Sequence, residues 1–267
     1  MKLSAALGLL FHIQFTLQIA LLPTLKALWQ RPSLIFTPSA LINIFMAHVW
    51  SFMAVHIDQN AKLEKAELLP SNAFGVVLDI GAGHGHTVNY LDRSKVSQYI
   101  ALEPNAMMHN EIRAFANGAG FSEADETLVI LPCGAEDIDS ILSLLGGKRR
   151  TVDTIVSVLA LCSVPNAQAA INDIVHEVLK PGGQFLFYEH VASPRADVAW
   201  WQSFWTPLWR LVFGGCSLNR QTHLWVENIE GDGKTVWKEG RIWGQPNEPE
   251  ENLFWHRSGR FVKAWSD

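Results

Sequence analysis

The sequence predicts an α/β fold: a doubly wound, mostly parallel, seven-stranded sheet with a hydrophobic helical extension at the N-terminus. Three observations lead to this prediction. An apolar run at 76–80 enters a glycine-rich loop, short apolar segments alternate with helical ones past residue 74, and residues 3–25 contain no Asp, Glu, Lys or Arg. Strands that alternate with helices favour right-handed crossovers and therefore a parallel sheet.

The glycine-rich loop is the first candidate binding element. Asp79 lies near the end of the apolar run, and Gly81, Gly83 and Gly85 follow on alternate positions. Glycine permits a sharp turn and lets the backbone approach a ligand closely. We expect a helix to follow and to direct its N-terminus at that ligand. The loop therefore predicts a nucleoside-type cofactor at the carboxyl edge of the sheet.

The spacing of the loop distinguishes between two cofactor classes. Dinucleotide sites carry G-x-G-x-x-G, whereas His86 stands here at the position of the third glycine. A nicotinamide oxidoreductase is therefore disfavoured. S-adenosylmethionine carries a cationic sulfonium and no phosphate, so an acid at Asp79 is useful. Glu103 ends a second apolar strand, where a carboxylate accepts hydrogen bonds from both ribose hydroxyls.

The remaining elements follow from periodicity. A helix with an apolar face over 170–179 is stopped by Lys180-Pro181-Gly182-Gly183, because proline cannot continue a helix and glycine permits the turn. Segments 235–243 and 260–265 predict a hairpin-like edge containing one antiparallel strand. The other strands are expected at 74–80, 98–103, 127–131, 153–159 and 184–190.

The N-terminus is the most apolar part of the chain. Residues 3–25 are long enough to cross a bilayer as a helix, and a second uncharged run covers 32–57. We expect a membrane anchor over residues 1–57 and a cofactor-binding domain over 58–267. A cleaved signal peptide, a packed helical extension and an interface-lying helix remain alternatives. Segment 41–69 predicts one or two helices that lead into the domain and cover the cofactor.

Composition limits the partners. Charged residues make up 18% of the chain and the net charge is −5, so nothing indicates nucleic-acid binding. The three cysteines, Cys133, Cys162 and Cys216, show neither metal-ligand spacing nor a disulfide framework. We therefore expect no metal and a reducing compartment.

Several segments together resemble the class I S-adenosylmethionine-dependent methyltransferases, closest to the ubiquinone and menaquinone branch. They are residues 78–85, Glu103, 133–137 and 179–183. Segments 159–164, 188–192 and 213–220 are similar to the membrane-anchored, methyltransferase-like thiol S-methyltransferases. This resemblance implies methylation of small alkyl thiols, an N-terminal anchor and a cytoplasmic catalytic domain at the endoplasmic reticulum or a similar membrane.

The resemblance also implies a set of cofactor-binding positions. The family often has an acid where Gly134 stands, so the adenine contact is expected from Ala135 and Glu136 instead. His84 and His86 either touch the cofactor's carboxylate or face solvent. The expected cofactor-binding residues are Asp79, Gly81, Ala82, Gly83, Gly85, Glu103, Pro104, Ala135, Glu136, Leu159 and Ala160.

The catalytic candidate is His190, at the carboxyl end of the fifth strand. The alternative is a histidine that only bonds backbone. Glu189 would face the other side of the strand and is the weaker candidate. A thiol acceptor needs only a weak base, whereas a hydroxyl needs a positioned one.

The expected acceptor-pocket residues are Cys162, Trp201, Trp205 and Arg220. Cys162 is predicted to be a wall residue rather than a nucleophile. Arg220 either binds an acidic substrate or caps a helix. The aromatic run over 200–213 forms either core or membrane-interface packing, or a substrate lid.

The predicted function is S-adenosylmethionine-dependent methyl transfer to a small lipophilic acceptor, with a thiol favoured. O-, N- or C-methylation of a specialised metabolite or a quinone-like molecule is the first alternative. A non-catalytic, cofactor-binding membrane protein is an alternative of another class. The expected partners are the small-molecule acceptor and a membrane, with no nucleic acid.

Overall fold

A seven-stranded sheet forms the centre of the computed structural model, which describes residues 1–265. Its order is β3-β2-β1-β4-β5-β9-β8, and β9 runs antiparallel to both neighbours while β1 to β5 are parallel. This confirms the predicted doubly wound fold with one antiparallel strand near the edge. The strands are β1 (Gly75–Ile80), β2 (Val96–Leu102), β3 (Leu128–Leu131), β4 (Val152–Val158), β5 (Leu179–His190), β8 (Trp237–Gly244) and β9 (His256–Lys263), with a small separate pair, β6 (Glu230–Gly231) and β7 (Lys234–Thr235).

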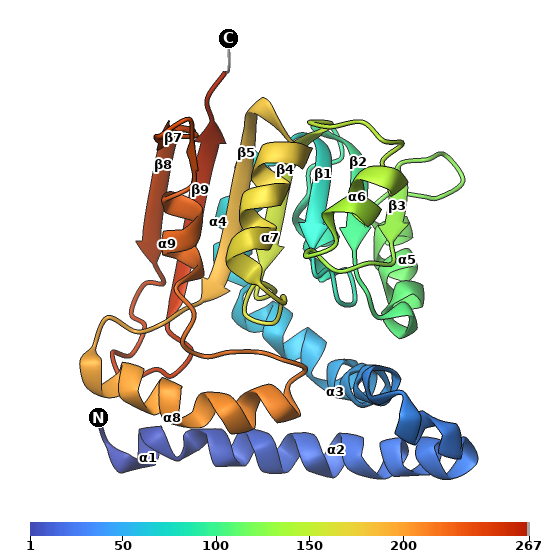
Figure 1. The fold of residues 1–267 in the computed structure, drawn as a ribbon, viewed down its shortest axis with the longest axis vertical. Coiled ribbons are helices and arrows are strands. Elements are labelled where there is room, and N and C mark those ends of the chain that lie inside the picture. The colour runs from blue at the N-terminus through green and yellow to red at the C-terminus, as the bar shows by residue number, and fades with distance from the viewer. Residues whose placement is uncertain (266–267) are drawn as a thin grey trace.

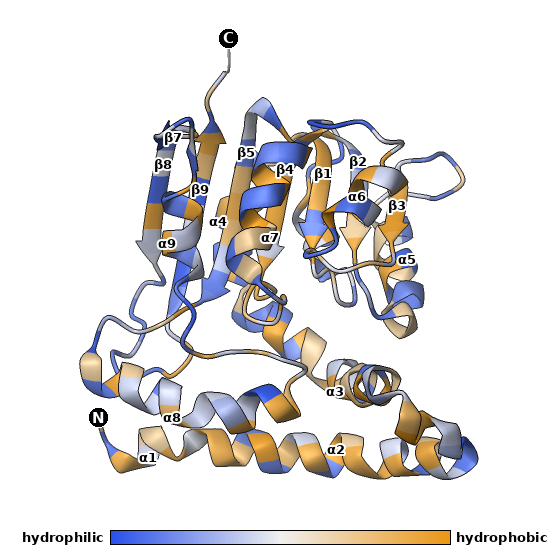
Figure 2. Ribbon diagram, in the orientation of Figure 1, coloured by the Kyte–Doolittle hydropathy of each residue, from blue (hydrophilic) through white to orange (hydrophobic). Residues whose placement is uncertain are grey.

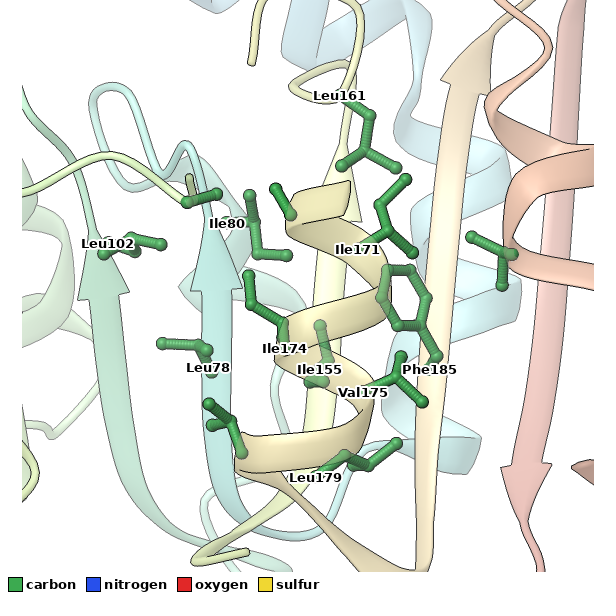
Figure 3. Packing of buried hydrophobic residues seen from close by; sticks show 14 of the residues in the cluster. Leu78, Ile80, Leu102, Ile155, Leu161, Ile171, Ile174, Val175, Leu179 and Phe185 are labelled. Atoms are coloured by element: carbon green, nitrogen blue, oxygen red, sulfur yellow. The ribbon is translucent and has the colours of Figure 1, made fainter. Parts of the chain in front are cut away.

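Helices cover both faces of the sheet (Figure 1). One face packs against α6 (Ile138–Leu144), α7 (Ala167–Asp173) with the π-helical turn η4 (Ile174–Val178), and α9 (Thr222–Glu227). Figure 3 shows Ile171, Ile174 and Val175 directed onto the sheet, against residues such as Ile155 and Phe185. The other face packs against α4 (Lys62–Asn72), η2 (His86–Tyr90) and α5 (His109–Gly118).

The fifth strand begins earlier than expected. The strand was predicted from residue 184, after a stop at Lys180-Pro181-Gly182-Gly183, but β5 already begins at Leu179. Leu179 pairs with Val152, and the register then shifts before Thr154 pairs with Gln184. This irregularity accommodates the proline and the two glycines within the strand.

The segment after the glycine-rich loop corrects a second expectation. A helix was predicted there, but the structure contains only the five-residue 3₁₀ helix η2, followed by extended chain at Leu91. Gly85 packs tightly against α5, where an added Cβ would lie 3.0 Å from the Cα of Ile112. Leu91 directly after η2 has extended backbone, so the helix ends after five residues and no helix dipole of useful length points at the loop.

The N-terminal segment folds as α1 (Leu3–Ala6), α2 (Gly8–Gln30), η1 (Pro32–Phe36) and α3 (Pro38–Asn60). Helix α2 lies alongside the aromatic helix α8 (Ala196–Val212) at the carboxyl end of the parallel strands (Figure 1). The Trp205 indole N–H donates to the Ala6 carbonyl at 2.8 Å, and the Met1 ammonium pairs with Asp197. The extension is therefore joined to the rest of the chain by specific contacts.

Two helical stretches, Leu3–Gln30 and Pro38–Asn60, are long and apolar enough to cross a membrane. Figure 2 shows the strongly apolar character of α2. Such helices are weak evidence for a membrane, because soluble cores and signal sequences share these properties. The predicted division at 57/58 falls within α3, which continues to Asn60, and the division remains a prediction.

Candidate cofactor and acceptor site

The ends of β1 and β2 are joined through Glu103. One carboxylate oxygen accepts the backbone N–H of Gly83 at 2.9 Å, and the other accepts that of Asn105 at 2.8 Å. Glu103 is only 7% exposed, and burial raises its pKa to about 7. Each carboxylate oxygen has two lone pairs, so Glu103 retains acceptor capacity for a ligand's hydroxyl groups.

Asp79 is bonded within the core. Its carboxylate accepts the Tyr99 hydroxyl at 2.7 Å, and burial raises its pKa to about 6. The charge of Lys65 acts in the opposite direction and lowers the pKa of Asp79. Lys65 itself is buried, forms an ion pair with Asp58 and lies 4.4 Å from the centre of the Tyr90 ring. Asp79 therefore supports the strand end from inside the protein.

The glycine-rich loop has the conformation that glycine favours. The φ angles of Gly81, Gly83 and Gly85 are +64°, +56° and +85°, in the left-handed region. An added Cβ at Gly81 would lie 2.7 Å from the Ala160 Cβ, whereas at Gly83 it would meet open space. The loop therefore packs closely against the segment after β4 at one glycine and leaves room at the next.

A pocket lies between this loop and helix α3. Its walls include the loop residues Gly81, Ala82, Gly83 and His84, the strand-end residues Val158 and Leu159, and the helix residues Trp50, Ala54, Ile57 and Asp58. Lys65 from α4 also contributes. Segment 41–69 was predicted to cover the cofactor, and the structure places α3 and α4 at the wall of this pocket. Gly83, which lines this pocket, donates its N–H to the Glu103 carboxylate, and that carboxylate keeps acceptor capacity of the kind that ribose hydroxyls require.

The expected adenine-side residues lie in the loop after β3. Ala135 is buried and Glu136 is exposed. A Cβ added to Gly134 would lie 2.4 Å from both carboxylate oxygens of Glu136. The Glu136 carboxylate thus lies where an acidic side chain at 134 would project. Pro104 is exposed directly after Glu103.

Glu189 has a role that the sequence interpretation missed. Its fully buried carboxylate accepts hydrogen bonds from the Ser157 hydroxyl at 2.7 Å and from the N–H groups of Ala160 and Leu161 at 3.0 and 3.1 Å. These bonds hold the turn after β4, where Leu159 has a φ of +54°. An acid directly after the apolar run 185–188 was the available signal, because a buried carboxylate needs donors.

His190 lies in a buried cluster with two cysteines. Its Nε2 lies 3.3 Å from the Cys216 sulfur, and the ligand atoms of His190, Cys162 and Cys216 all lie within 4.8 Å of one another. Within the described residues, Nδ1 of His190 has no hydrogen-bond partner. His190 therefore lies against cysteine side chains and not, as the alternative had it, against backbone groups alone. Cys162 and Cys216 were not expected to meet.

The other acceptor-pocket candidates make structural contacts. Arg220 Nη1 donates to the carbonyls of Leu161 at 2.6 Å and Val164 at 2.7 Å, so it fastens the turn after β4 rather than a helix end. The Trp205 indole N–H donates a hydrogen bond to the Ala6 carbonyl of α1. Trp201 is half-buried in the same aromatic cluster.

The histidines of the loop are half-buried. The His86 ring packs on Phe115, with ring centres 4.3 Å apart, and burial lowers the pKa of both His84 and His86. His84 lines the pocket together with His86. Neither histidine is a simple solvent-facing loop residue.

The strand order, the glycine-rich loop and the acid at the end of β2 define a Rossmann-like, nucleoside-cofactor-binding α/β protein. The sequence profile of the methyltransferase domain family matches residues 53–228. The chain belongs to this family, and its methyl donor is S-adenosyl-L-methionine. A methyltransferase of this kind implies a small-molecule acceptor.

Two curated relatives are human thiol S-methyltransferases. This chain is 42% identical to TMT1A over 76 residues, which cover 27% of this chain and 30% of that protein. It is 38% identical to TMT1B over 81 residues, which cover 30% of this chain and 33% of that protein. The matched part thus spans about a third of the relatives' length.

Solved structures agree on the fold. The YcgJ protein of Bacillus subtilis is 17% identical with a TM-score of 0.53, over 79% of this chain and all of that one. The geranyl diphosphate C-methyltransferase of Streptomyces coelicolor, solved with S-adenosyl-L-homocysteine, is 13% identical with a TM-score of 0.53, over 78% of this chain and 80% of that one. At these identities the likeness shows the architecture alone.

Proposed function

We propose that this protein is a membrane-associated enzyme that transfers a methyl group from S-adenosylmethionine to a small lipophilic thiol. The observation that carries the proposal is the buried Glu103 carboxylate, which holds the Gly83 N–H beside an open pocket. The thiol assignment is supported by the two relatives named thiol S-methyltransferase.

We assign the cofactor's ribose hydroxyls to Glu103 and its methionine part to the glycine-rich loop. Gly81, Gly83 and Gly85 shape the loop, and Ala82 lines the pocket. Asp79 positions the loop through its bond to Tyr99. The adenine ring is assigned to the segment formed by Pro104, Ala135 and Glu136, and the wall nearest the sulfonium to Leu159 and Ala160.

The cofactor supplies an electrophilic methyl carbon, which the acceptor's sulfur attacks in line as the carbon–sulfonium bond breaks. The chain's own contribution is positioning, which is worth several kcal/mol in reactions of this type. Leu159 lines the cofactor pocket, and Cys162 lies three residues further along the same turn. We place the acceptor here, between the turn and the aromatic helix with Trp201.

His190 is the proposed catalytic residue. It ends β5 at the carboxyl edge of the sheet, where ligands of open α/β sheets bind. Its role is to favour the thiolate form of the acceptor, because the thiolate is the nucleophile. Glu189 and Arg220 hold the neighbouring turn, so they act as positioning residues.

We further propose that the helices α1, α2 and α8 attach the protein to a membrane surface, with the catalytic domain in the cytoplasm, at the endoplasmic reticulum or a similar membrane. Exposed apolar side chains on these helices support this, among them Phe11, Leu22, Trp200 and Leu211. The packing of α2 along α8 favours an interface-lying orientation over a spanning one.

An activity screen tests the proposed function. The full-length protein in detergent is incubated with methyl-labelled S-adenosylmethionine and, in parallel, an alkyl thiol, a phenol and an amine. Labelled thioether is expected with the wild type and not with Glu103→Ala. Labelling of the phenol or the amine but not of the thiol overturns the acceptor assignment. If S-adenosylhomocysteine does not bind in isothermal titration, the enzymatic proposal itself is wrong.

A further inference from the structure

The buried cluster of Cys162, His190 and Cys216 combines three groups from three separate segments. Cys162 lies in the turn after β4, His190 ends β5, and Cys216 follows the aromatic helix α8. All three side chains are at most 9% exposed, and one ligand atom from each lies within 4.8 Å of the others. The fold thus gathers two thiols and an imidazole that no sequence motif connects.

Hydrogen bonding does not account for this histidine. Within the described residues, Nδ1 of His190 has no hydrogen-bond partner, while the ring interacts with both thiols: Nε2 lies 3.3 Å from the Cys216 sulfur, and the Cys162 thiol is a second hydrogen-bond partner. Sulfur is a weak hydrogen-bond partner. Neither nitrogen of the His190 ring therefore has a strong partner, because no oxygen or nitrogen atom of the described residues bonds to it. Buried imidazoles are normally hydrogen-bonded, and one that is not requires another explanation, such as an ion.

The geometry and chemistry of the cluster match a soft metal ion. Thiolates and imidazole together select zinc among the common divalent ions. With zinc–sulfur bonds of about 2.3 Å and zinc–nitrogen bonds of about 2.0–2.1 Å, tetrahedral ligand atoms lie roughly 3.6–3.8 Å apart. The observed 3.3 Å between His190 Nε2 and Cys216 Sγ is close to this, and all three atoms lie within the 4.8 Å limit.

The charge of such a site also suits its burial. Two thiolates and a neutral imidazole carry two negative charges, which a divalent cation cancels. A neutral, paired site avoids the high cost of burying isolated charges. Arg220 is half-buried nearby and is bonded to the carbonyls of Leu161 and Val164, so it does not occupy the centre of the cluster.

We propose that Cys162, His190 and Cys216 form a zinc-binding site that joins the end of β5 to the turn after β4 and to the segment after α8. Three protein ligands are typical of zinc sites that keep a fourth position open. This proposal departs from the sequence-based expectation that the chain binds no metal.

The fourth position of the zinc ion would bind the acceptor thiol and favour its thiolate form. This part of the inference rests on the proposed function. An acceptor R–SH that coordinates zinc loses its proton to solvent, because a coordinating thiol is deprotonated. Its sulfur lone pair then forms the S–CH₃ bond, and S-adenosylhomocysteine leaves with the electrons of the broken carbon–sulfonium bond. His190 acts in this step as a ligand, together with both cysteines.

The test is the metal content of the full-length protein, purified in detergent without chelators and analysed by elemental mass spectrometry. We expect about one zinc ion per chain in the wild type. Cys162→Ser and Cys216→Ser should each lower the zinc content at least tenfold. Cys133→Ser is the matched control and should keep its zinc, because Cys133 lies outside the cluster.

Two further measurements keep the test decisive. Binding of S-adenosylhomocysteine to each variant reports whether the cofactor site is still folded, independently of the metal. Replacement of zinc by cobalt should give thiolate-to-cobalt absorption that is lost in Cys216→Ser. The proposal is overturned by a wild type without zinc even after incubation with zinc salt, by stoichiometric copper or iron in its place, or by folded cysteine variants that retain zinc. If the protein binds zinc but methylates no thiol, the zinc-site proposal stands and only the proposed function is refuted.

Discussion

The carboxylate of Glu103 lies 2.9 Å from the backbone nitrogen of Gly83, and this side-chain bond adds to the two backbone bonds by which the N–H groups of the loop after β1 reach the Leu102 carbonyl at the end of β2. A second bond, to the N–H of Asn105, fixes the other oxygen. Asn105 in turn donates from its side chain to the Asn43 carbonyl of α3 at 2.9 Å. One acid thus connects the glycine-rich loop, the turn after β2 and, through Asn105, the helix that lines the pocket.

Replacing this acid should weaken cofactor binding. Glu103→Gln removes the charge and places an amide N–H₂ opposite a backbone donor, so we expect the affinity for S-adenosylhomocysteine to fall by about 10- to 100-fold, as for hydrogen bonds to charged groups. Isothermal titration measures the change. Glu67→Gln, at an exposed position of α4, should bind like the wild type. Equal affinity of both variants would contradict the assignment of Glu103.

The same acid makes cofactor binding depend on pH. Because the pKa of Glu103 is raised to about 7, the carboxylate is ionised above that pH and protonated below it. The affinity for S-adenosylhomocysteine should therefore fall as the pH is lowered from 8 to 6, by up to about tenfold per unit below the pKa. Titrations across this range should show the decline in the wild type and a flatter profile in Glu103→Gln.

The stability of the cofactor-free protein should depend on pH in the opposite direction from cofactor affinity, and fall as the pH rises. The folded-state pKa of Glu103 lies above its ordinary value, so its protonated form favours the folded state. This contribution is fully present below about pH 4.5 and is lost as the pH rises through about 7. Melting temperatures of the wild type relative to Glu103→Gln should therefore decrease across this range. A constant difference would contradict the raised pKa.

The glycine-rich loop should tolerate no side chain at Gly81. Gly81→Ala combines a positive φ with an approach of 2.7 Å to Ala160, whereas Gly146→Ala has a positive φ and open space. The control should lose about 1–2 kcal/mol of unfolding free energy, because an L-residue is strained in the left-handed region. The Gly81 variant should lose a further 1–3 kcal/mol from overpacking, together with cofactor affinity. Denaturant unfolding and titration measure both effects, and equal losses would show that the close approach is unimportant.

Glu189 should prove essential for stability. Glu189→Ala leaves the N–H groups of Ala160 and Leu161 without their acceptor in a buried turn. Each unsatisfied group costs about 1–3 kcal/mol, so we expect a loss of about 3 kcal/mol or more. Glu227→Ala, on the surface of α9, should change stability by less than about 0.5 kcal/mol. Similar unfolding midpoints for both variants would refute this role.

Membrane attachment should depend on the N-terminal helix. Phe11 and Leu22 are 69% and 75% exposed on α2, and burying such a side chain is worth about 1.5–3 kcal/mol. Each of Phe11→Glu and Leu22→Glu should reduce binding to phosphatidylcholine vesicles at least tenfold in flotation experiments. Leu144→Glu, at an exposed apolar position of α6, is the matched control and should float like the wild type. Unchanged flotation of the α2 variants would exclude this membrane surface.

Much of the architecture was predictable because its signals are local. The apolar run before Gly81 and the alternation of strands and helices predicted the parallel sheet, and the segment after residue 230 predicted its antiparallel edge. Only the short helix η2 follows the loop, and Gly85 in front of it packs against α5, a contact between segments distant in sequence that no local pattern encodes. The early start of β5 depends on pairing with Val152, another non-local contact.

The site was predictable only in part for the same reason. Glycines and an acid at strand ends are recognisable in the sequence, and Glu103 and Gly83 do meet. The contacts of Glu189 with the turn after β4, and of Arg220 with the same turn, arise from tertiary packing. The meeting of Cys162 with Cys216 likewise depends on how α8 returns to the sheet, which no spacing along the chain encodes.

Helix α3 has one further consequence. It packs along α2, where Val49 shares a buried cluster with Leu9 and Ile13, while Trp50, Ala54, Ile57 and Asp58 line the pocket. The same helix therefore contacts both α2 and the cofactor pocket, and a shift of α2 against α3 is expected to alter the shape of that pocket. By thermodynamic linkage, any binding event that shifts this contact changes cofactor affinity by the same free energy by which the cofactor changes that event.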